Sequence, residues 1–174
     1  AAGVRKQLGF RTIFNLLGPL INPANAKNQL LGVYDEKWVK IHCEVLKDLG
    51  SKSALVVHGY DGLDEISLST KTKIAELKNG SIKEYNFDPK EYGYEYINND
   101  EIKGGDAKFN AKRFIEMLDG SHKSYQYIVE INAGAAIYLS DKVDSIKDGI
   151  KIAKNVIEKK ITKNYLNKIL NRNE

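Results

Sequence analysis

Three carboxylates lie within five residues of one loop, directly after a short apolar run. The loop covers residues 59–67 (Gly-Tyr-Asp-Gly-Leu-Asp-Glu-Ile-Ser), and its acids are Asp61, Asp64 and Glu65. Like charges at this spacing raise one another's pKa unless a cation neutralises them. Magnesium is usually held by one or two carboxylates beside a substrate phosphate. The spacing alone is equally consistent with a magnesium site and with a solvated acidic turn.

The elements around this loop predict an α/β fold. Residues 53–58 (Ser-Ala-Leu-Val-Val-His) form a short β-rich run that predicts a buried strand, and ligands gather at the carboxyl ends of such strands. Asn79-Gly80 predicts a type I′ hairpin turn. We expect a mixed sheet of about four strands flanked by helices, with part of the sheet missing. The predicted strands are 29–34, 53–58, 72–78 and 81–87, and the predicted helices are 11–17, 36–49, 106–118, 125–139, 145–159 and 162–171.

Composition excludes several classes of protein. The chain has 174 residues, of which 42% are hydrophobic and 29% are charged, too apolar for a disordered chain. No apolar run approaches the roughly 18 residues of a membrane helix, and no secretory leader precedes the first elements. The single cysteine, Cys43, excludes an internal disulfide and is expected to be a core residue in a reducing cytoplasm.

The net charge of +4 is carried by the last 35 residues, 140–174. A basic stretch of this kind can bind nucleic acid through phosphate neutralisation. However, Ile146, Ile150, Ala153 and Ile157 recur at helical spacing, so the lysines are expected on a water-facing side of a helix. Only Tyr165 interleaves with them, which leaves no platform for stacking bases. The sequence therefore favours a solvated helix face over a nucleic-acid partner.

Other polar residues support fewer hypotheses. Arg5 precedes a stiff loop at residues 18–23, where an arginine could grip a carboxylate or phosphate with two hydrogen bonds. Taken alone, it is more often a surface residue. We expect His58 to be structural and Asn132 to be a buried amide with its hydrogen bonds satisfied. Gly134, within a predicted helix, would allow another backbone to approach closely.

Five ordered stretches resemble one enzyme family. Residues 4–23 are similar to the central signature of the anthranilate phosphoribosyltransferases, and the likeness runs in unbroken order to about residue 156. Its other stretches are 29–34, 56–59 with 62–67, 104–107 with 110–111, and 131–136.

This resemblance implies a function and assigns residues to it. Family members join the amine of anthranilate to phosphoribosyl pyrophosphate, release pyrophosphate, and use Mg²⁺ in tryptophan biosynthesis. By position, Arg5, Gly18 and Pro19 would bind anthranilate, and Asp64 and Glu65 would bind magnesium. No residue is assigned as a general base. The fold implied is the C-terminal type of the nucleoside phosphorylase and phosphoribosyltransferase class.

The resemblance also implies that residues 1–174 are the C-terminal portion of the catalytic α/β domain. The family's N-terminal helical domain and its glycine-rich phosphate-binding loop have no counterpart here, so we expect the chain alone to be inactive and to bind magnesium weakly. The parent enzyme would be a homodimer through the helical domain, and association or fusion with a glutamine amidotransferase stays open. Two alternatives remain, a non-catalytic nucleic-acid-binding relative and a pyrimidine-nucleoside phosphorylase.

Overall fold

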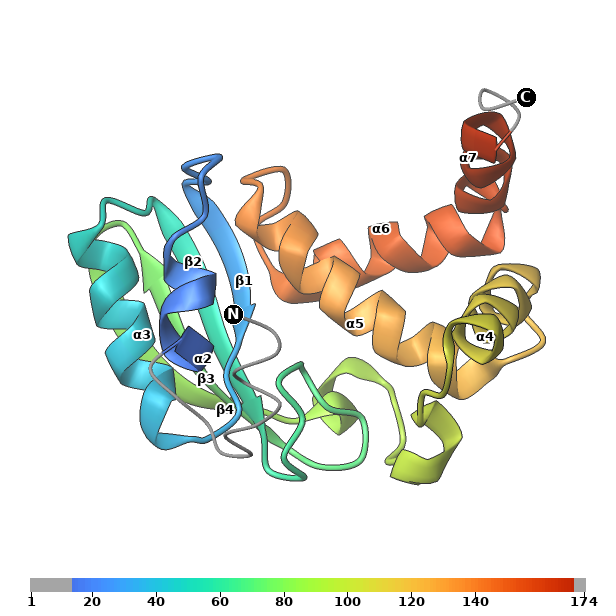
Figure 1. Ribbon diagram of the computed structural model, residues 1–174, viewed down its shortest axis with the longest axis horizontal. Helices are drawn as coiled ribbons and strands as arrows, with labels where there is room; N and C mark the ends of the chain where they lie inside the picture. The colour runs from blue at the N-terminus through green and yellow to red at the C-terminus, as the bar shows by residue number, and fades with distance from the viewer. Residues whose placement is uncertain (1–13, 171–174) are drawn as a thin grey trace.

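The computed structural model describes residues 14–170 as a four-stranded sheet with helices on both faces (Figure 1). The strands are β1 (Asn28–Gly32), β2 (Ser53–Gly59), β3 (Thr72–Lys78) and β4 (Ser81–Phe87), in that order across the sheet. β1 pairs parallel to β2, whereas β2, β3 and β4 pair antiparallel. The predicted mixed α/β sheet is therefore confirmed.

A crossover helix, α3 (Lys37–Asp48), joins the two parallel strands and covers one face of the sheet. Val39, Cys43 and Leu46 on this helix are buried against Val56 and Ala75 of the sheet. The apolar residues of α3 recur every three or four positions, which places them on one helix face. This βαβ unit fixes where β2 ends, and the acidic loop begins at that end.

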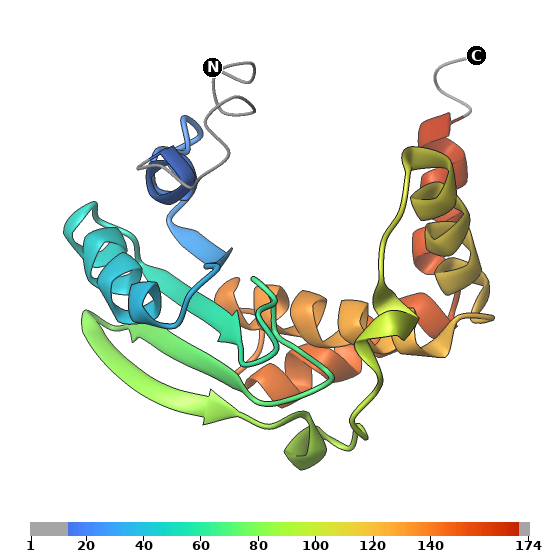
Figure 2. The ribbon, with the colours of Figure 1, turned by 60° about the horizontal axis from the view of Figure 1, so that its bottom comes forward.

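Two long helices cover the opposite face, α5 (Lys123–Leu139) and α6 (Ile146–Glu158) (Figure 2). Ile128, Ile131 and Ala135 of α5 pack against Leu55 and Val57 of β2. All seven residues of β2 are buried because helices cover both of its faces. The helix α5 therefore lies directly beside the carboxyl end of the central strand.

Glycines bring α5 and α6 together. A Cβ on Gly149 would lie 2.1 Å from the carbonyl oxygen of Gly134, and a Cβ on Gly134 would lie 2.6 Å from the backbone nitrogen of Ile150. Only a residue without a side chain permits this approach. The expectation that Gly134 admits a neighbouring backbone is confirmed.

The remaining elements lie at the two ends of the described chain and in the connection between sheet and helices. A short helix α2 (Phe14–Leu17) continues into a 3₁₀ turn, η1 (Gly18–Leu20). The turns η2 (Pro89–Tyr92) and η3 (Asn99–Ile102) were not predicted, since they carry no apolar periodicity. The helices α4 (Ala107–Asp119) and α7 (Ile161–Leu170) contact each other beyond the far end of α5. Within residues 14–170, no helix has the length and apolar character needed to cross a bilayer.

The hairpin between β3 and β4 turns as the sequence predicts. Asn79 and Gly80 both have positive φ values, 51° and 75°, which is the conformation of a type I′ turn. The hairpin strands run to Phe87, so β3 and β4 have the predicted bounds. The first strand is shorter than predicted: it ends at Gly32, because the chain then turns into α3.

Candidate functional site

The acidic loop begins where β2 ends. The amide of Gly59 donates a hydrogen bond across the loop to the carbonyl of Leu63 at 2.8 Å, and the amide of Gly62 donates to the carbonyl of Gly59 at 2.8 Å. Gly62 has a φ of +93°, which side chains rarely adopt. These bonds close a compact turn that brings the next residues, Asp64 and Glu65, back toward the sheet.

Asp61 is the anchor of this turn rather than a free carboxylate. Its Oδ2 accepts hydrogen bonds from the hydroxyls of Ser67 and Ser69, at 2.7 and 2.5 Å, and from Nδ2 of Asn99 at 3.1 Å. Its Oδ1 accepts from the amide of Leu63 at 3.2 Å. Burial alone would raise the pKa of Asp61, but these donors together outweigh it and lower the pKa below its usual value. Asp61 is therefore charged and engaged within the loop.

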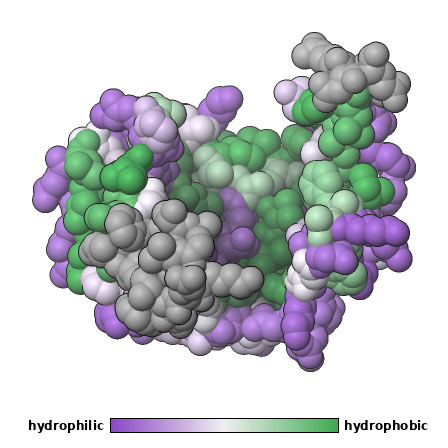
Figure 3. Space-filling model, in the orientation of Figure 1, coloured by the Kyte–Doolittle hydropathy of each residue, from purple (hydrophilic) through white to green (hydrophobic). Residues whose placement is uncertain are grey.

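Asp64 and Glu65 line the mouth of a cleft between the sheet and α5. The cleft has a volume of about 570 Å³. In Figure 3 the surface is hollowed here, and apolar side chains gather on its floor. Its walls come from β1, the end of β2, the acidic loop, η3 and α5. The lining residues are Leu30, Gly32, Val57, Leu63, Asp64, Glu65, Ile102, Tyr125, Ile128, Val129, Asn132 and Ala133.

The environment of the cleft affects Glu65. Partial burial in the cleft, and then the negative charge of Asp64, raise the pKa of Glu65 above its ordinary value of 4.5. In the described residues, no three His, Cys, Asp or Glu side chains converge as metal ligands. The donor set is thus two carboxylates, which fits magnesium completing its coordination with water and phosphate oxygens. It does not fit zinc, which takes three or four protein ligands.

Gly32 makes room for the pair. Leu30 and Gly32 are on the face of β1 that lines the cleft, and a Cβ on Gly32 would lie 1.5 Å from the carbonyl oxygen of Asp64. The loop backbone therefore rests directly on the strand backbone. Sequence reasoning did not single out Gly32, although a glycine inside an apolar strand is a signal of such close approach.

The opposite wall of the cleft also holds the loop. The side chain of Asn132 on α5 accepts a hydrogen bond from the amide of Ile66 at 2.9 Å and donates to the carbonyl of the same residue at 3.0 Å. It donates again to the carbonyl of Ile128 at 3.0 Å. Ile66 directly follows Glu65 and is fully buried. Asn132 is indeed satisfied, as predicted, but it is half-buried in the cleft wall.

Comparison with known proteins agrees with this geometry. Residues 1–160 match the family described as "Glycosyl transferase family, a/b domain". The chain belongs to this glycosyl transferase family.

Two curated relatives that are similar in sequence to this chain have the same name. It is 47% identical over 169 residues to the anthranilate phosphoribosyltransferase of Methanobrevibacter smithii, covering 97% of this chain and 50% of the relative. It is 53% identical over 154 residues to that of Clostridium beijerinckii, covering 88% of this chain and 45% of the relative. The chain therefore spans about half the length of the curated relatives it matches.

Solved structures give the same result. The anthranilate phosphoribosyltransferase of Thermus thermophilus superposes with a TM-score of 0.80 at 38% identity, over 90% of this chain and 46% of that one. The Saccharomyces cerevisiae enzyme, solved in complex with PRPP and Mg, superposes with a TM-score of 0.79 at 28% identity, over 91% of this chain and 46% of that one. The α/β fold of the phosphoribosyltransferase type, which the resemblance implied, is therefore confirmed.

Gly18 and Pro19, which the resemblance assigns to anthranilate, lie apart from the carboxylates. Gly18 and Pro19 are exposed in η1 and do not line the cleft. The turn is held near α3, where Nε2 of His42 contacts the carbonyl of Leu16 at 3.2 Å. Arg5 lies outside the described residues. The structure thus brings Asp64 and Glu65 together and leaves Gly18 and Pro19 on a separate surface of this glycosyl transferase domain.

Two residues with reactive side chains are structural. Nδ1 of His58 lies 2.8 Å from the carbonyl of Val33 and ties the end of β2 to the segment after β1, as expected. Cys43 is fully buried in the α3 face, and burial raises its pKa to about 11, so it is not a nucleophile.

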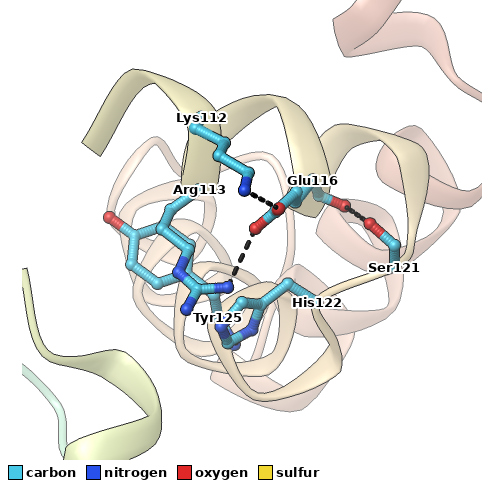
Figure 4. A network of polar contacts seen from close by, with 6 residues as sticks. All are labelled: Lys112, Arg113, Glu116, Ser121, His122 and Tyr125. Carbon is cyan, nitrogen blue, oxygen red and sulfur yellow. Dashed lines mark hydrogen bonds and ion pairs between the residues drawn. The ribbon is translucent and has the colours of Figure 1, made fainter. Parts of the chain in front are cut away.

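Several charged residues outside the cleft form ion pairs. Glu116 contacts Lys112 and Arg113 on α4 at 3.7 and 2.9 Å, and the hydroxyl of Ser121 donates to its carbonyl at 3.1 Å (Figure 4). This network secures the corner between α4 and α5.

Within the described part of the basic C-terminal stretch, α6 has a solvated face. Lysines of α6 are exposed, and Lys151 pairs with Asp148 at 2.8 Å, while Ile146, Ile150, Ala153 and Ile157 are buried on the other side. This is the arrangement that their helical spacing predicts.

Proposed function

We propose that the protein containing this chain is an anthranilate phosphoribosyltransferase of tryptophan biosynthesis, acting in the cytoplasm. It would transfer the phosphoribosyl group of phosphoribosyl pyrophosphate to the amine of anthranilate and release pyrophosphate. The observation that supports this most is the Asp64–Glu65 pair at the mouth of a cleft at the carboxyl end of β2. The names of the relatives at 47% and 53% identity point to the same reaction.

The carboxylate pair would act on the leaving group. Aromatic amines are weak nucleophiles, so the reaction depends on stabilising the departing pyrophosphate. Asp64 and Glu65 would hold Mg²⁺, whose charge neutralises the negative charge on pyrophosphate. The apolar walls formed by Leu30, Ile128 and Val129 limit the access of water to that part of the cleft.

The acceptor would be held by other residues. We assign Arg5 to the carboxylate of anthranilate, which it can bind with two hydrogen bonds, and Gly18 and Pro19 to the wall beside the ring. Holding both substrates in one orientation supplies the proximity contribution to the rate. Because Gly18 and Pro19 lie apart from the carboxylates, the donor and acceptor would meet between η1 and the cleft.

We also propose that residues 1–174 are the C-terminal part of the catalytic α/β domain. The chain covers 45–50% of the curated relatives, and β1 has no second neighbouring strand among residues 14–170. The remaining half would supply the glycine-rich phosphate-binding loop and a helical dimerisation domain. Accordingly, the purified 174-residue chain should form no phosphoribosylanthranilate and bind Mg²⁺ weakly when pyrophosphate is absent.

The test is a fluorescence assay of phosphoribosylanthranilate formation by the full-length protein as Mg²⁺ is varied. Glu65→Gln should raise the half-saturating Mg²⁺ concentration by about tenfold or more, since even residues that only support a metal ligand contribute this much. Glu95→Gln is the matched control, because Glu95 is an exposed acid outside the cleft. Absence of transfer by the wild-type protein, or an equal Mg²⁺ response in both variants, would contradict the proposed function.

Arg5 has a separate test in the same protein. Arg5→Ala should raise the KM for anthranilate strongly and change the KM for phosphoribosyl pyrophosphate little. The opposite pattern would reassign Arg5 to the donor.

A further inference from the structure

Hydrogen bonds hold the backbone of the loop on both sides of the Asp64–Glu65 pair. On one side, the carboxylate of Asp61 accepts hydrogen bonds from the amide of Leu63 and from the hydroxyls of Ser67 and Ser69. On the other side, the backbone of Ile66 is bound in both directions by the side chain of Asn132. Fixing the residue before and the residue after the pair fixes the backbone from which the two carboxylates extend.

Of Asp61 and Asn132, Asn132 is the anchor that belongs to a different element. Asp61 lies in the same loop as the residues it holds, so it shapes the turn. Asn132 lies on α5, 66 residues further along the chain from Ile66, and it fixes where that turn stands relative to the helix. Its amide has little freedom of its own, since it also donates to the carbonyl of Ile128 one helical turn earlier.

We propose that Asn132 is a positioning residue for the Asp64–Glu65 pair, setting its affinity for the magnesium ion of the donor. This inference rests on the proposed phosphoribosyl transfer and adds a residue to its metal site. Asn132 would act through the backbone of Ile66 and not as a metal ligand. Residues that orient a metal ligand through hydrogen bonds typically change metal affinity when they are removed.

The same chain contains a matched control. The side chain of Asn110 on α4 accepts the amide of Gly105 at 2.8 Å and donates to the carbonyl of Gly105 at 3.0 Å. It therefore makes the same two-way bond to one backbone residue that Asn132 makes to Ile66. Asn110 does not line the cleft. Truncating either asparagine removes a two-way bond to one backbone residue, and truncating Asn132 also removes its bond to Ile128. Only the truncation of Asn132 releases the carboxylate turn.

The experiment measures phosphoribosylanthranilate formation by the full-length protein as Mg²⁺ and phosphoribosyl pyrophosphate are varied independently. Asn132→Ala should raise the half-saturating Mg²⁺ concentration by about tenfold. Its KM for the donor at saturating Mg²⁺ should change little. Asn110→Ala should leave the Mg²⁺ requirement of the enzyme unchanged. Combining Asn132→Ala with Glu65→Gln should give less than the product of the two single effects on Mg²⁺, because both act on one site.

A second variant guards against a fold defect. In Asn132→Ser the hydroxyl can still donate to the carbonyl of Ile128 within α5, but it is too short to hold Ile66. It should keep the wild-type unfolding temperature more nearly than Asn132→Ala and show the same shift in Mg²⁺ requirement.

Three results would overturn the inference while leaving the proposed function intact. The first is an active enzyme in which Asn132→Ser and Asn110→Ala have the same Mg²⁺ requirement. The second is a rise in donor KM at saturating Mg²⁺ without a change in Mg²⁺ requirement, which would make Asn132 a direct donor ligand. The third is fully multiplicative effects of Asn132→Ala and Glu65→Gln. An inactive wild-type protein would instead contradict the function itself.

Discussion

The backbone of Gly32 lies directly against the backbone carbonyl of Asp64. A Cβ at position 32 would lie 1.5 Å from the carbonyl oxygen and 2.4 Å from the carbonyl carbon of Asp64. The backbone of β1 thus supports the loop that carries the carboxylates. Any side chain at position 32 must push the loop away from the strand or the strand out of the sheet.

Gly32→Ala should therefore impair both stability and the metal site. Inserting a methyl group into a closely packed contact costs about 1–3 kcal/mol of unfolding free energy, and the displaced Asp64 should raise the Mg²⁺ requirement of the full-length enzyme. Urea unfolding and the Mg²⁺-dependent assay measure the two effects. Gly18→Ala is the stability control, since a Cβ there has no heavy atom within 4 Å. Equal stability of the two variants would show that the contact is not tight.

The pH dependence of the metal requirement should report Glu65. Because burial and Asp64 raise its pKa above 4.5, Glu65 takes up a proton earlier than an ordinary glutamate as pH falls. As pH falls and Glu65 takes up its proton, the Mg²⁺ concentration that the wild-type enzyme needs for half-maximal activity should rise. The same assay, run across about pH 5–8, measures this change. A requirement that stays constant until pH falls below 4.5 would contradict this.

Glu65→Gln should separate function from stability. A glutamate with a raised pKa binds its proton more tightly in the folded state, so stability falls as pH rises from 4.5 through the raised pKa. The side-chain amide that replaces the carboxylate in the variant carries no charge, so the variant does not lose this stability as pH rises. We expect the unfolding temperature of Glu65→Gln at neutral pH to equal or exceed that of the wild type while its Mg²⁺ response is impaired. A clearly lower unfolding temperature would mean that the carboxylate supports the fold.

Asp61 should behave in the opposite way. Its pKa is lowered in the fold, so its contribution to stability is present above 3.8 and is lost as pH falls through the lowered value. Asp61→Asn exchanges a charged acceptor for an amide and should cost about 1–3 kcal/mol at neutral pH. The difference from wild type, measured by urea unfolding, should shrink below pH 3.8.

The matched control for Asp61 is Asp141→Asn. Asp141 pairs with Lys52 at 2.5 Å on the surface, and it makes no contact with the loop. Exposed pairs of this kind contribute about 0–1 kcal/mol. If both aspartates cost the same, the hydrogen bonds of Asp61 do not organise the turn.

The contact between α5 and α6 should be intolerant of a methyl group. A Cβ on Gly149 would lie 2.1 Å from the carbonyl oxygen of Gly134, so Gly149→Ala should lower the unfolding free energy by about 1–3 kcal/mol or more. Asn155→Ala, at an exposed position of α6, should change it by less than about 0.5 kcal/mol. A tolerated Gly149→Ala would mean that the helices can separate without loss, and α5 would then be a poor support for the cleft.

Local patterns predicted most of the elements and the position of the carboxylates. The apolar run before Gly59, the Asn79-Gly80 turn and the helical spacing in α6 each depend on neighbouring residues, and all three are confirmed. The acids after β2 were found because strand ends in α/β sheets are where ligands bind.

Two of the features that the sequence did not reveal depend on contacts between residues far apart along the chain. The packing of Gly32 on Asp64 and the bonds from Asn132 to Ile66 join segments that no local pattern relates. The sequence indicated that Asn132 would be satisfied, but not by which partner. The turns η2 and η3 were missed because they are held by side-chain caps, such as Asp88 accepting the amide of Lys90, and not by apolar periodicity.

The wide separation of Asn132 from Ile66 also sets an order of events during synthesis. The antiparallel pairing of β2, β3 and β4 joins neighbouring segments, which close early because their loops are short. Asn132, which binds the backbone of Ile66, is translated 66 residues later. Synthesis of those residues takes several seconds at ordinary elongation rates. A nascent chain therefore has its central strands before it has its finished carboxylate turn, and the turn stays open to solvent until α5 docks.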